Sequence, residues 1–387
     1  MRPFLLPVLF LVLGLLCLVT GLLPAKSASE LADRTVPVLT FVVAMTIVTE
    51  LADDAGLFRW ASSRMARLGR HSVVRLWLLS IGLASVITLF FSLDTTAVLV
   101  TPVVVLLALH AKIPPLPFAL TTIWLANTVS LLLPVSNLSN LLAQQHTGLT
   151  PAAFAGLMWA PALVALLVPV LLLWVMFRKQ LRGTYALAST DAAGDKLLLL
   201  AAAGVVVVLL PLLVSGLPVQ WPALGAAVVL LVFYLWRRPH VLRISMLPWK
   251  PLMLTTGLFM VVETLHAQGL AELLLRQVIP GDGLAPLVQL AALGTGSANL
   301  ANNLPAYLAL EPAAGSPLRY AALLIGVNVG PLITPWASLA TLLWHERLAV
   351  LGVRVRWSGF AVAGIVAVVI TIPLAVFALW LSAGMPA

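Results

Sequence analysis

The chain has 387 residues, of which 61% are hydrophobic and only 9% are charged. Soluble globular domains carry about 25% charged residues, and a buried core cannot explain so large a deficit. The composition therefore excludes a water-soluble fold and indicates helices that are solvated by lipid. The net charge of +9 does not indicate a nucleic-acid partner, because the basic residues lie in short loops between apolar runs.

The first apolar run, residues 4–23, contains the only cysteine of the chain, Cys17. A single cysteine cannot form an internal disulfide, and it excludes a metal site built from thiolates. We therefore expect no thiolate metal site, and we expect no cofactor. Arg2 before this run and Ala-Lys-Ser-Ala-Ser after it are similar to a signal peptide, but the length of the apolar stretch favours a retained transmembrane helix.

Apolar runs of about 17–25 residues, which is enough to span a bilayer, recur along the whole chain. The predicted fold is an all-α polytopic membrane protein with nine crossings and two re-entrant hairpins. The predicted crossings are residues 4–23, 36–52, 117–146, 152–177, 196–214, 219–236, 250–267, 318–344 and 357–383. The predicted hairpins are residues 73–111 and 283–312. An amphipathic stretch with spaced arginines, residues 57–68, is expected at the membrane interface.

A polar linker, residues 183–195, divides the chain into a first membrane repeat (1–182) and a second (196–387). The linker is expected in the cytoplasm, because eighteen Lys and Arg residues then lie inside and only four outside. The positive-inside rule favours this orientation strongly. An odd number of crossings then predicts a bacterial inner-membrane protein with its N-terminus inside and its C-terminus outside.

The two halves share motifs in the same order. Residues 50–57 match residues 263–270 at Glu, Gly and Leu, and residues 127–134 match residues 328–335 at Asn, Leu and Pro. The offsets are 213 and 201 residues. In the predicted topology the matched segments run in opposite directions. This is the inverted-topology repeat that many transporters use.

Polar clusters interrupt the apolar sequence at both hairpin tips and within crossings 117–146 and 318–344. Prolines in these crossings disfavour a continuous helix, and open backbone at membrane depth must be covered by protein or line a cavity. Such broken helices form the midplane sites of transporters. Polar residues that only join helices are the alternative, which repetition in both halves disfavours. The residues expected to bind the solute are Asp94, Thr95, Thr96, Asn127, Ser130, Ser136, Asn137, Ser297, Asn299, Asn302, Asn303, Asn328, Thr334 and Ser338.

Asp94 lies at the first hairpin tip between two apolar runs. A carboxylate there is costly, so it is by default a functional hypothesis, although a structural hydrogen bond to the hairpin backbone is the alternative. Lys and Arg lie nearly all in loops, and the histidines lie in loops or at helix ends. Asp94 is therefore the first candidate for a proton-exchanging group. Glu263, within an apolar run, is the second candidate.

These motifs resemble those of the arsenite/antimonite efflux permeases of the ion-transporter superfamily, which is related to the sodium–dicarboxylate symporter fold. The residues that carry the resemblance are 53–61, 90–94, 101–102, 134–138, 302–305 and the specific string Gly-Pro-Leu-Ile-Thr-Pro-Trp-Ala-Ser-Leu-Ala-Thr-Leu-Leu-Trp at 330–344. The resemblance implies export of trivalent arsenic or antimony, either by proton exchange or with a soluble ATPase subunit. The chain departs from the family at Asn127 and Asn328, where the permeases usually carry Asp, and at Leu93, where they carry Asn.

The expected solute is a metalloid oxyacid. Arsenite near pH 7 is mostly a neutral trihydroxide, and Asn, Ser and Thr side chains can donate to and accept from its hydroxyls. A related carrier for a carboxylate or an inorganic anion is the alternative, because half-helix ends can hold anions. The tips, Ser-Leu-Asp-Thr at 92–95 and Ser-Ala-Asn at 297–299, lack the Ser-Asn-Thr signature of dicarboxylate carriers. A membrane-embedded enzyme is disfavoured, because no His-Glu-x-x-His or Ser-His-Asp set is present.

Overall fold

The computed structural model describes residues 5–185 and 195–386, and within these ranges the protein is built from helices and short helical turns. Seven of the described helices are long and apolar enough to cross a membrane, and α1 and α7 are shorter apolar helices. The predicted class, an all-α polytopic membrane protein, is confirmed. Most of the predicted linker, residues 186–194, lies outside the described residues.

The elements follow the predicted segments closely. The first half comprises α1 (Leu5–Val19), α2 (Ala25–Asp54), α3 (Leu57–Leu68), α4 (Val73–Phe91), α5 (Leu93–Thr95), η2 (Thr96–Val100), α6 (Thr101–His110), α7 (Leu116–Val129), η3 (Pro134–Ser136), α8 (Leu138–Thr147) and α9 (Pro151–Phe177). The second half comprises α10 (Lys196–Val214), α11 (Gln220–Arg237), η4 (Pro239–Val241), η5 (Ile244–Met246), α12 (Trp249–Ala267), α13 (Leu270–Leu275), α14 (Leu284–Leu300), α15 (Asn303–Leu310), η6 (Glu311–Ala313), α16 (Pro317–Val329), η7 (Gly330–Leu332), η8 (Pro335–Ala337), α17 (Leu339–Val350) and α18 (Trp357–Ser382).

Two boundaries differ from the sequence-based expectation. Helix α2 begins at Ala25 rather than at residue 36, and α17 continues to Val350 rather than to residue 344. The extra turns are polar, and an exposed pair between Lys26 and Glu30, 3.9 Å apart, lies on the first turns of α2. Apolar runs mark only the part of a helix that lipid surrounds, whereas the backbone hydrogen bonds continue beyond it.

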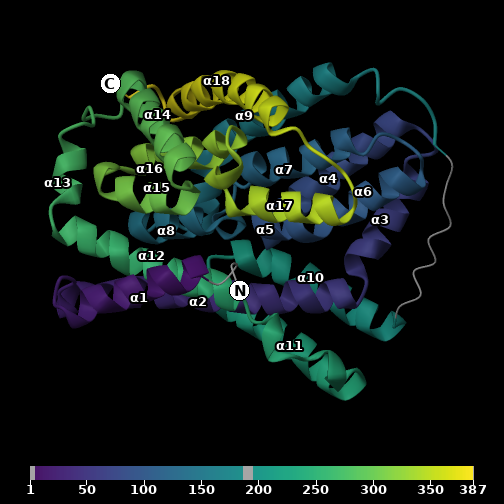
Figure 1. Cartoon of the computed structure of the whole chain (residues 1–387), viewed down its shortest axis with the longest axis horizontal. Helices are drawn as coiled ribbons and strands as arrows, with labels where there is room; N and C mark the ends of the chain where they lie inside the picture. The colour runs from purple at the N-terminus through teal and green to yellow at the C-terminus, as the bar shows by residue number, and fades with distance from the viewer. Residues whose placement is uncertain (1–4, 186–194, 387) are drawn as a thin grey trace.

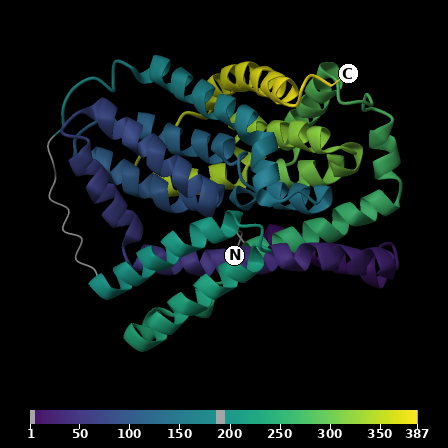
Figure 2. The same cartoon turned by 180° about the vertical axis from the view of Figure 1, so that it is seen from behind.

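The helices form two layers (Figures 1 and 2). The first layer contains α1, α2 and α10–α12, in which α1 packs against α12 and α2 against α11. The second layer contains α4–α9 and α14–α18, in which α9 packs against α18, α14 against α16 and α4 against α7. Two connecting helices, α3 and α13, link the layers at opposite ends of the molecule (Figure 1). We call these ends the α3 end and the α13 end.

The order α2, α3, hairpin, broken helix, α9 recurs as α12, α13, hairpin, broken helix, α18. Helix α3 packs against both α4 and α6, so both arms of the first hairpin return to the α3 end. Helix α13 packs against α15 and η6, where the second hairpin returns. The two repeats therefore enter from opposite ends, which is the predicted inverted topology.

The amphipathic stretch forms α3 with the predicted bounds. Its apolar face is buried through Phe58, Met65 and Ala66, and the Phe58 ring lies edge-on to Phe91, with centroids 6.1 Å apart. The connecting helix thereby packs directly against the end of α4 at the hairpin tip.

Close packing of α18 on the second broken helix requires glycine. A Cβ atom at Gly364 would overlap the carbonyl group of Leu332 in η7. Small residues at such crossings let membrane helices approach closely.

We predict that Gly364→Val lowers the thermal unfolding temperature of the detergent-solubilised protein, because overpacking costs about 1–3 kcal/mol. Gly359→Val, on the same helix, is the matched control, since a Cβ there meets nothing within 4 Å. Equal unfolding temperatures for the two variants would contradict this packing.

Candidate functional site

Both hairpin tips contain a strained residue. Ser92, between α4 and α5, has φ 117°, and Asn302, between α14 and α15, has φ 145°. Each side chain accepts a hydrogen bond from the next arm, Ser92 Oγ from the Thr95 amide and Asn302 Oδ1 from the Leu304 amide, both at 3.4 Å. Such backbone conformations cost roughly 1–3 kcal/mol in non-glycine residues and gather at functional sites.

Both broken helices open in the same way. A short 3₁₀ turn, η3 or η8, lies between two extended residues: Leu133 and Asn137 in the first repeat, Thr334 and Ser338 in the second. The equivalent residues are again 201 positions apart. Extended backbone at this depth exposes amide and carbonyl groups that a helix would have paired.

Asn299 joins the second hairpin to the second broken helix. Its amide Nδ2 donates to the carbonyls of Thr295 and Gly330, both at 2.9 Å. Its Oδ1 accepts from the amide of Thr334 at 3.1 Å and from the Thr334 hydroxyl at 2.9 Å. Asn302 Nδ2 donates to the Trp336 carbonyl at 2.9 Å. Three of the predicted site residues, Asn299, Asn302 and Thr334, therefore meet here, and their hydrogen bonds join the second hairpin tip to the opened part of the second broken helix.

The first hairpin meets the first broken helix through different groups. Ser136 Oγ donates to the Leu89 carbonyl at 2.8 Å, and the hydroxyls of Thr88 and Thr96 lie 2.8 Å apart. The Asp94 side chain is exposed at the tip. Within the described part of the chain it has no hydrogen-bond or ion-pair partner.

Asn328 connects the two repeats. Its Oδ1 accepts from Asn137 Nδ2 at 2.7 Å and from Ser139 Oγ at 3.4 Å, and its Nδ2 donates to Asn140 Oδ1 at 3.0 Å. All four side chains are buried. The two broken helices thus share one hydrogen-bonded network at the centre of the second layer.

The residues that correspond by repeat to this network do not form a second one. Asn127 corresponds to Asn328, while Ser338 and Thr341 correspond to Asn137 and Asn140. The atoms Asn127 Oδ1, Ser338 Oγ and Thr341 Oγ1 are all buried and have no hydrogen-bond partner in the part of the chain that the structure describes. Helix α7 packs against α17, and the Trp344 indole donates to the Ala119 carbonyl at 2.9 Å. Ser338 and Thr341 have shorter side chains than Asn137 and Asn140, so they do not reach Asn127 as those amides reach Asn328.

Other predicted residues bond locally. Ser130 Oγ donates to the Asn127 carbonyl at 2.8 Å, and Asn303 Oδ1 accepts from the Leu304 amide at 2.9 Å. Ser297 is half-buried and has no side-chain partner among the described residues. The four polar segments at 88–102, 127–142, 294–305 and 328–341 carry no Lys or Arg, and Asp94 is their only acid. The central site is therefore nearly free of charge.

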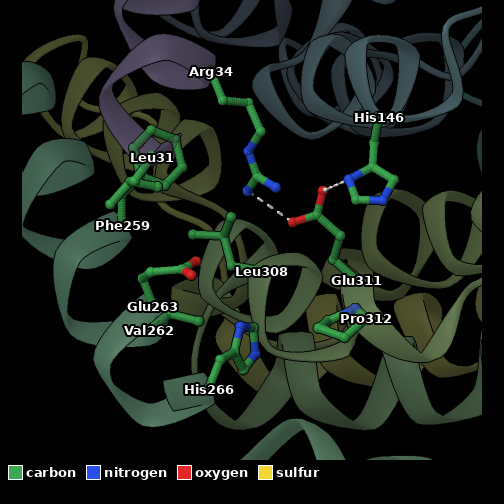
Figure 3. Close-up of a pocket in the computed structure, with 10 residues that line it drawn as sticks. All are labelled: Leu31, Arg34, His146, Phe259, Val262, Glu263, His266, Leu308, Glu311 and Pro312. Atoms are coloured by element: carbon green, nitrogen blue, oxygen red, sulfur yellow. Dashed lines mark hydrogen bonds and ion pairs between the residues drawn. The ribbon is translucent and has the colours of Figure 1, made fainter. Parts of the chain in front are cut away.

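Charged groups gather instead in a cavity of about 250 Å³ between the layers (Figure 3). Arg34 from α2 and Glu263 and His266 from α12 line one wall, and His146 and Glu311 line the other. The cavity lies where α2 packs against α8 and α12 packs against α15. Glu263, the second predicted proton-exchanging group, is thus separate from Asp94, which does not line this cavity.

The repeat counterpart of Glu263 is Glu50, which is exposed at the end of α2. Asp53 and the guanidinium of Arg347 on α17 act on it electrostatically. Sequence reasoning did not single out Glu311, Arg34 or Thr341. Glu311 carried a signal, because it is the only acidic residue between positions 283 and 345. Arg34 was one of the four basic residues expected outside, and its partner only became visible in three dimensions.

Inverted repeats with paired hairpins and broken helices around a central polar site define a multi-pass membrane transporter that binds a small solute. The comparisons with known proteins agree. A family model described as CitMHS, citrate transporter, matches residues 1–326. This chain belongs to that family of membrane transporters, which are not enzymes.

The curated relatives align over most of the chain. The chain is 30% identical over 372 residues to the arsenical pump membrane protein of Escherichia coli (strain K12), covering 88% of this chain and 85% of the relative. The arsenical pump membrane protein of Yersinia enterocolitica is 28% identical with the same coverage. The YdaH transporter of Alcanivorax borkumensis shares the fold, with a TM-score of 0.57 at 16% identity over 99% of both chains.

The contrast between Asn328 and Asn127 gives a test of the central network. We predict that Asn328→Ala lowers the free energy of unfolding by about 1–3 kcal/mol, because the buried atoms Asn137 Nδ2 and Asn140 Oδ1 lose their Asn328 partner. Asn127→Ala should cost less, because the Asn127 side chain bonds only the Ile123 carbonyl of its own helix, at 2.9 Å. Thermal unfolding in detergent measures both, and equal losses would contradict the asymmetry.

Proposed function

We propose that the protein exports arsenite or antimonite, as the neutral trihydroxide, in exchange for protons. The observation that carries this proposal is the alignment of the arsenical pump membrane proteins over nearly the whole chain at about 30% identity. The proposed exchanger works without an ATPase, although the resemblance also implies a soluble ATPase subunit as an alternative partner. The proposed location is the bacterial inner membrane, with the α3 end in the cytoplasm and the α13 end outside.

The near-neutral central site supports an uncharged solute. A carrier for citrate or another anion needs positive charge or several aligned helix N-termini, and the four polar segments contain no basic side chain. A trihydroxide needs groups that both donate and accept. Among the described residues the hydroxyls of Ser338 and Thr341 are unpaired groups of that kind, and Asn127 Oδ1 beside them is an unpaired acceptor. We therefore place the solute against these three atoms, with the tip residues Asn299 and Asn302 and the amide Asn137 around it.

Asp94 is the proposed coupling group. When deprotonated it accepts from a solute hydroxyl, and when protonated it loses that role, so a proton and a solute exclude each other. Relative movement of the two layers then exposes the loaded site to one end of the molecule at a time. An exchanger built in this way loads solute from the cytoplasm and returns with a proton from outside.

The substrate is tested by transport. We predict that expression in an arsenite-sensitive strain that lacks any arsenical ATPase raises tolerance to arsenite or antimonite. Everted vesicles from these cells should accumulate arsenite when a pH gradient is imposed, whereas citrate added in its place should not accumulate. Accumulation of citrate but not arsenite would transfer the assignment to the anion carrier.

Asp94→Asn tests the coupling. We predict that this variant loses arsenite accumulation driven by a pH gradient, at least about tenfold, because one titrating group sets the exchange. Exchange of labelled for unlabelled arsenite at equal pH should persist, since the site still binds the solute. Asp33→Asn, an exposed acid of α2 away from the tips, is the matched control. Normal gradient-driven transport by Asp94→Asn would move the role to Glu263.

A further inference from the structure

One ion pair joins the two layers directly. Arg34 Nη2 on α2 lies 3.0 Å from Glu311 Oε2 in η6 (Figure 3). Among the described residues no other ion pair within 4 Å crosses between the layers, because Arg237–Asp195 and Arg238–Asp54 lie within the first layer and Lys26–Glu30 within α2. The His266 ring nitrogen Nε2 lies 3.3 Å from the Ala309 carbonyl, which is a weaker contact across the same interface. We call this interface between the two layers the seam.

Glu311 is well shielded from solvent, with only 4% of its surface exposed. On its own layer the Tyr307 hydroxyl donates to Oε1 at 3.2 Å, and His146 Nδ1 lies 3.5 Å from the same atom. The remaining titratable groups around it come from three places. Tyr320 on α16 lies beside His146, with the two rings tilted and their centroids 5.1 Å apart, and Glu263 and His266 lie across the cavity. Glu272 and Arg276, both exposed, belong to the α13 segment that packs against η6. Arg34 is therefore the one basic side chain in direct contact with Glu311 that the other layer supplies.

The seam also carries charged side chains at the α3 end. There Arg347 on α17 acts electrostatically on Glu50 and Asp53 of α2. The ion pairs within 4 Å among the described residues do not include these three side chains. Glu50 and Glu263 are repeat-related, and Arg347 lies 201 positions after His146. The α13 end of the seam is thus joined by a direct ion pair, whereas the described residues of the α3 end are linked only by electrostatic interaction at longer range.

We propose that Glu311 is a second proton-binding site of the transport cycle, which takes up a proton from the α13 side whenever the layers separate from Arg34. This inference rests on the proposed exchange function and extends it. Moving Arg34 away leaves a buried carboxylate without its cation, which is strongly unfavourable. Protonation removes that charge.

The proton comes from water at the α13 end, through the cavity lined by His146 and His266, and it adds to a Glu311 carboxylate oxygen. When the layers close, Arg34 displaces it, and the proton returns to the same side. The cavity volume of about 250 Å³ accommodates several water molecules, each of which occupies about 30 Å³. Glu311 therefore carries no net proton across the membrane. It makes opening at the α13 end easier at low pH and harder at high pH, because the open state holds one proton more.

The test is arsenite exchange in proteoliposomes with the same pH on both sides, measured from pH 5.5 to 9. The Asp94 proton competes with solute at low pH, so it sets the acidic limb of the profile. Glu311 sets the alkaline limb, with a decline that approaches about tenfold per pH unit for one proton. We expect Glu311→Gln and Arg34→Gln to remove the alkaline decline and to keep gradient-driven accumulation. Arg34→Lys should retain the decline, and Glu272→Gln is the matched control.

An unchanged alkaline limb in Glu311→Gln would overturn the proposal. So would the loss of exchange at every pH in a folded Glu311→Gln protein, because the group would then be structural. If the wild-type protein moves no arsenite, the proposed function fails, and a readout without solute still tests the seam.

That readout is the distance between spin labels on the two layers, at Leu163→Cys on α9 and Val228→Cys on α11, in a Cys17→Ser background. Both positions are exposed, at 46% and 56%. We expect the open population to grow as the pH falls in the wild-type background and to be independent of pH with Glu311→Gln. A pH dependence that survives Glu311→Gln would overturn the proposal on its own.

Discussion

The structure depends on one constraint: a peptide group that leaves a helix at membrane depth must find a partner inside the protein. At both hairpin tips and in both broken helices, backbone groups lack their helical hydrogen bonds, and polar side chains nearby supply hydrogen bonds instead. Asn299 alone pairs groups of Thr295, Gly330 and Thr334. The strained Ser92 and Asn302 are tolerated because these contacts fix the tips. A solute site made from such segments is therefore rigid within each half.

Inverted repetition explains both the similarity and the difference between the halves. The same break is built twice, but Asn137 and Asn140 in one half correspond to Ser338 and Thr341 in the other. The longer amides reach Asn328 and complete a network, whereas the shorter hydroxyls leave Asn127 Oδ1 unpaired. Divergence by one or two atoms per side chain is enough to turn a structural contact into a candidate binding position.

Charged side chains are concentrated between the two layers rather than at the central polar site. The centre of the second layer is almost neutral, which suits an uncharged solute, while ionisable groups collect at the seam between the layers. A neutral site can bind and release its cargo without large electrostatic penalties. A charged seam makes the relative position of the layers sensitive to protonation, because a buried carboxylate needs its cation or a proton. In the proposed cycle, solute binding and gating are thereby separated in space.

The sequence by itself determined the lipid-solvated class, the helix order, both hairpins and both broken helices, because apolar length and proline act locally. It also determined the repeat, since Glu50 and Asn127 have matching partners in the second half. Only the tertiary structure decided which polar residues meet. It joined Asn328 to Asn137 and Asn140, gave Ser130 and Asn303 local backbone partners, and placed Glu311 against Arg34. These contacts of Asn328 and of Glu311 join residues 188 to 277 positions apart, and no local pattern encodes which of these distant residues meet.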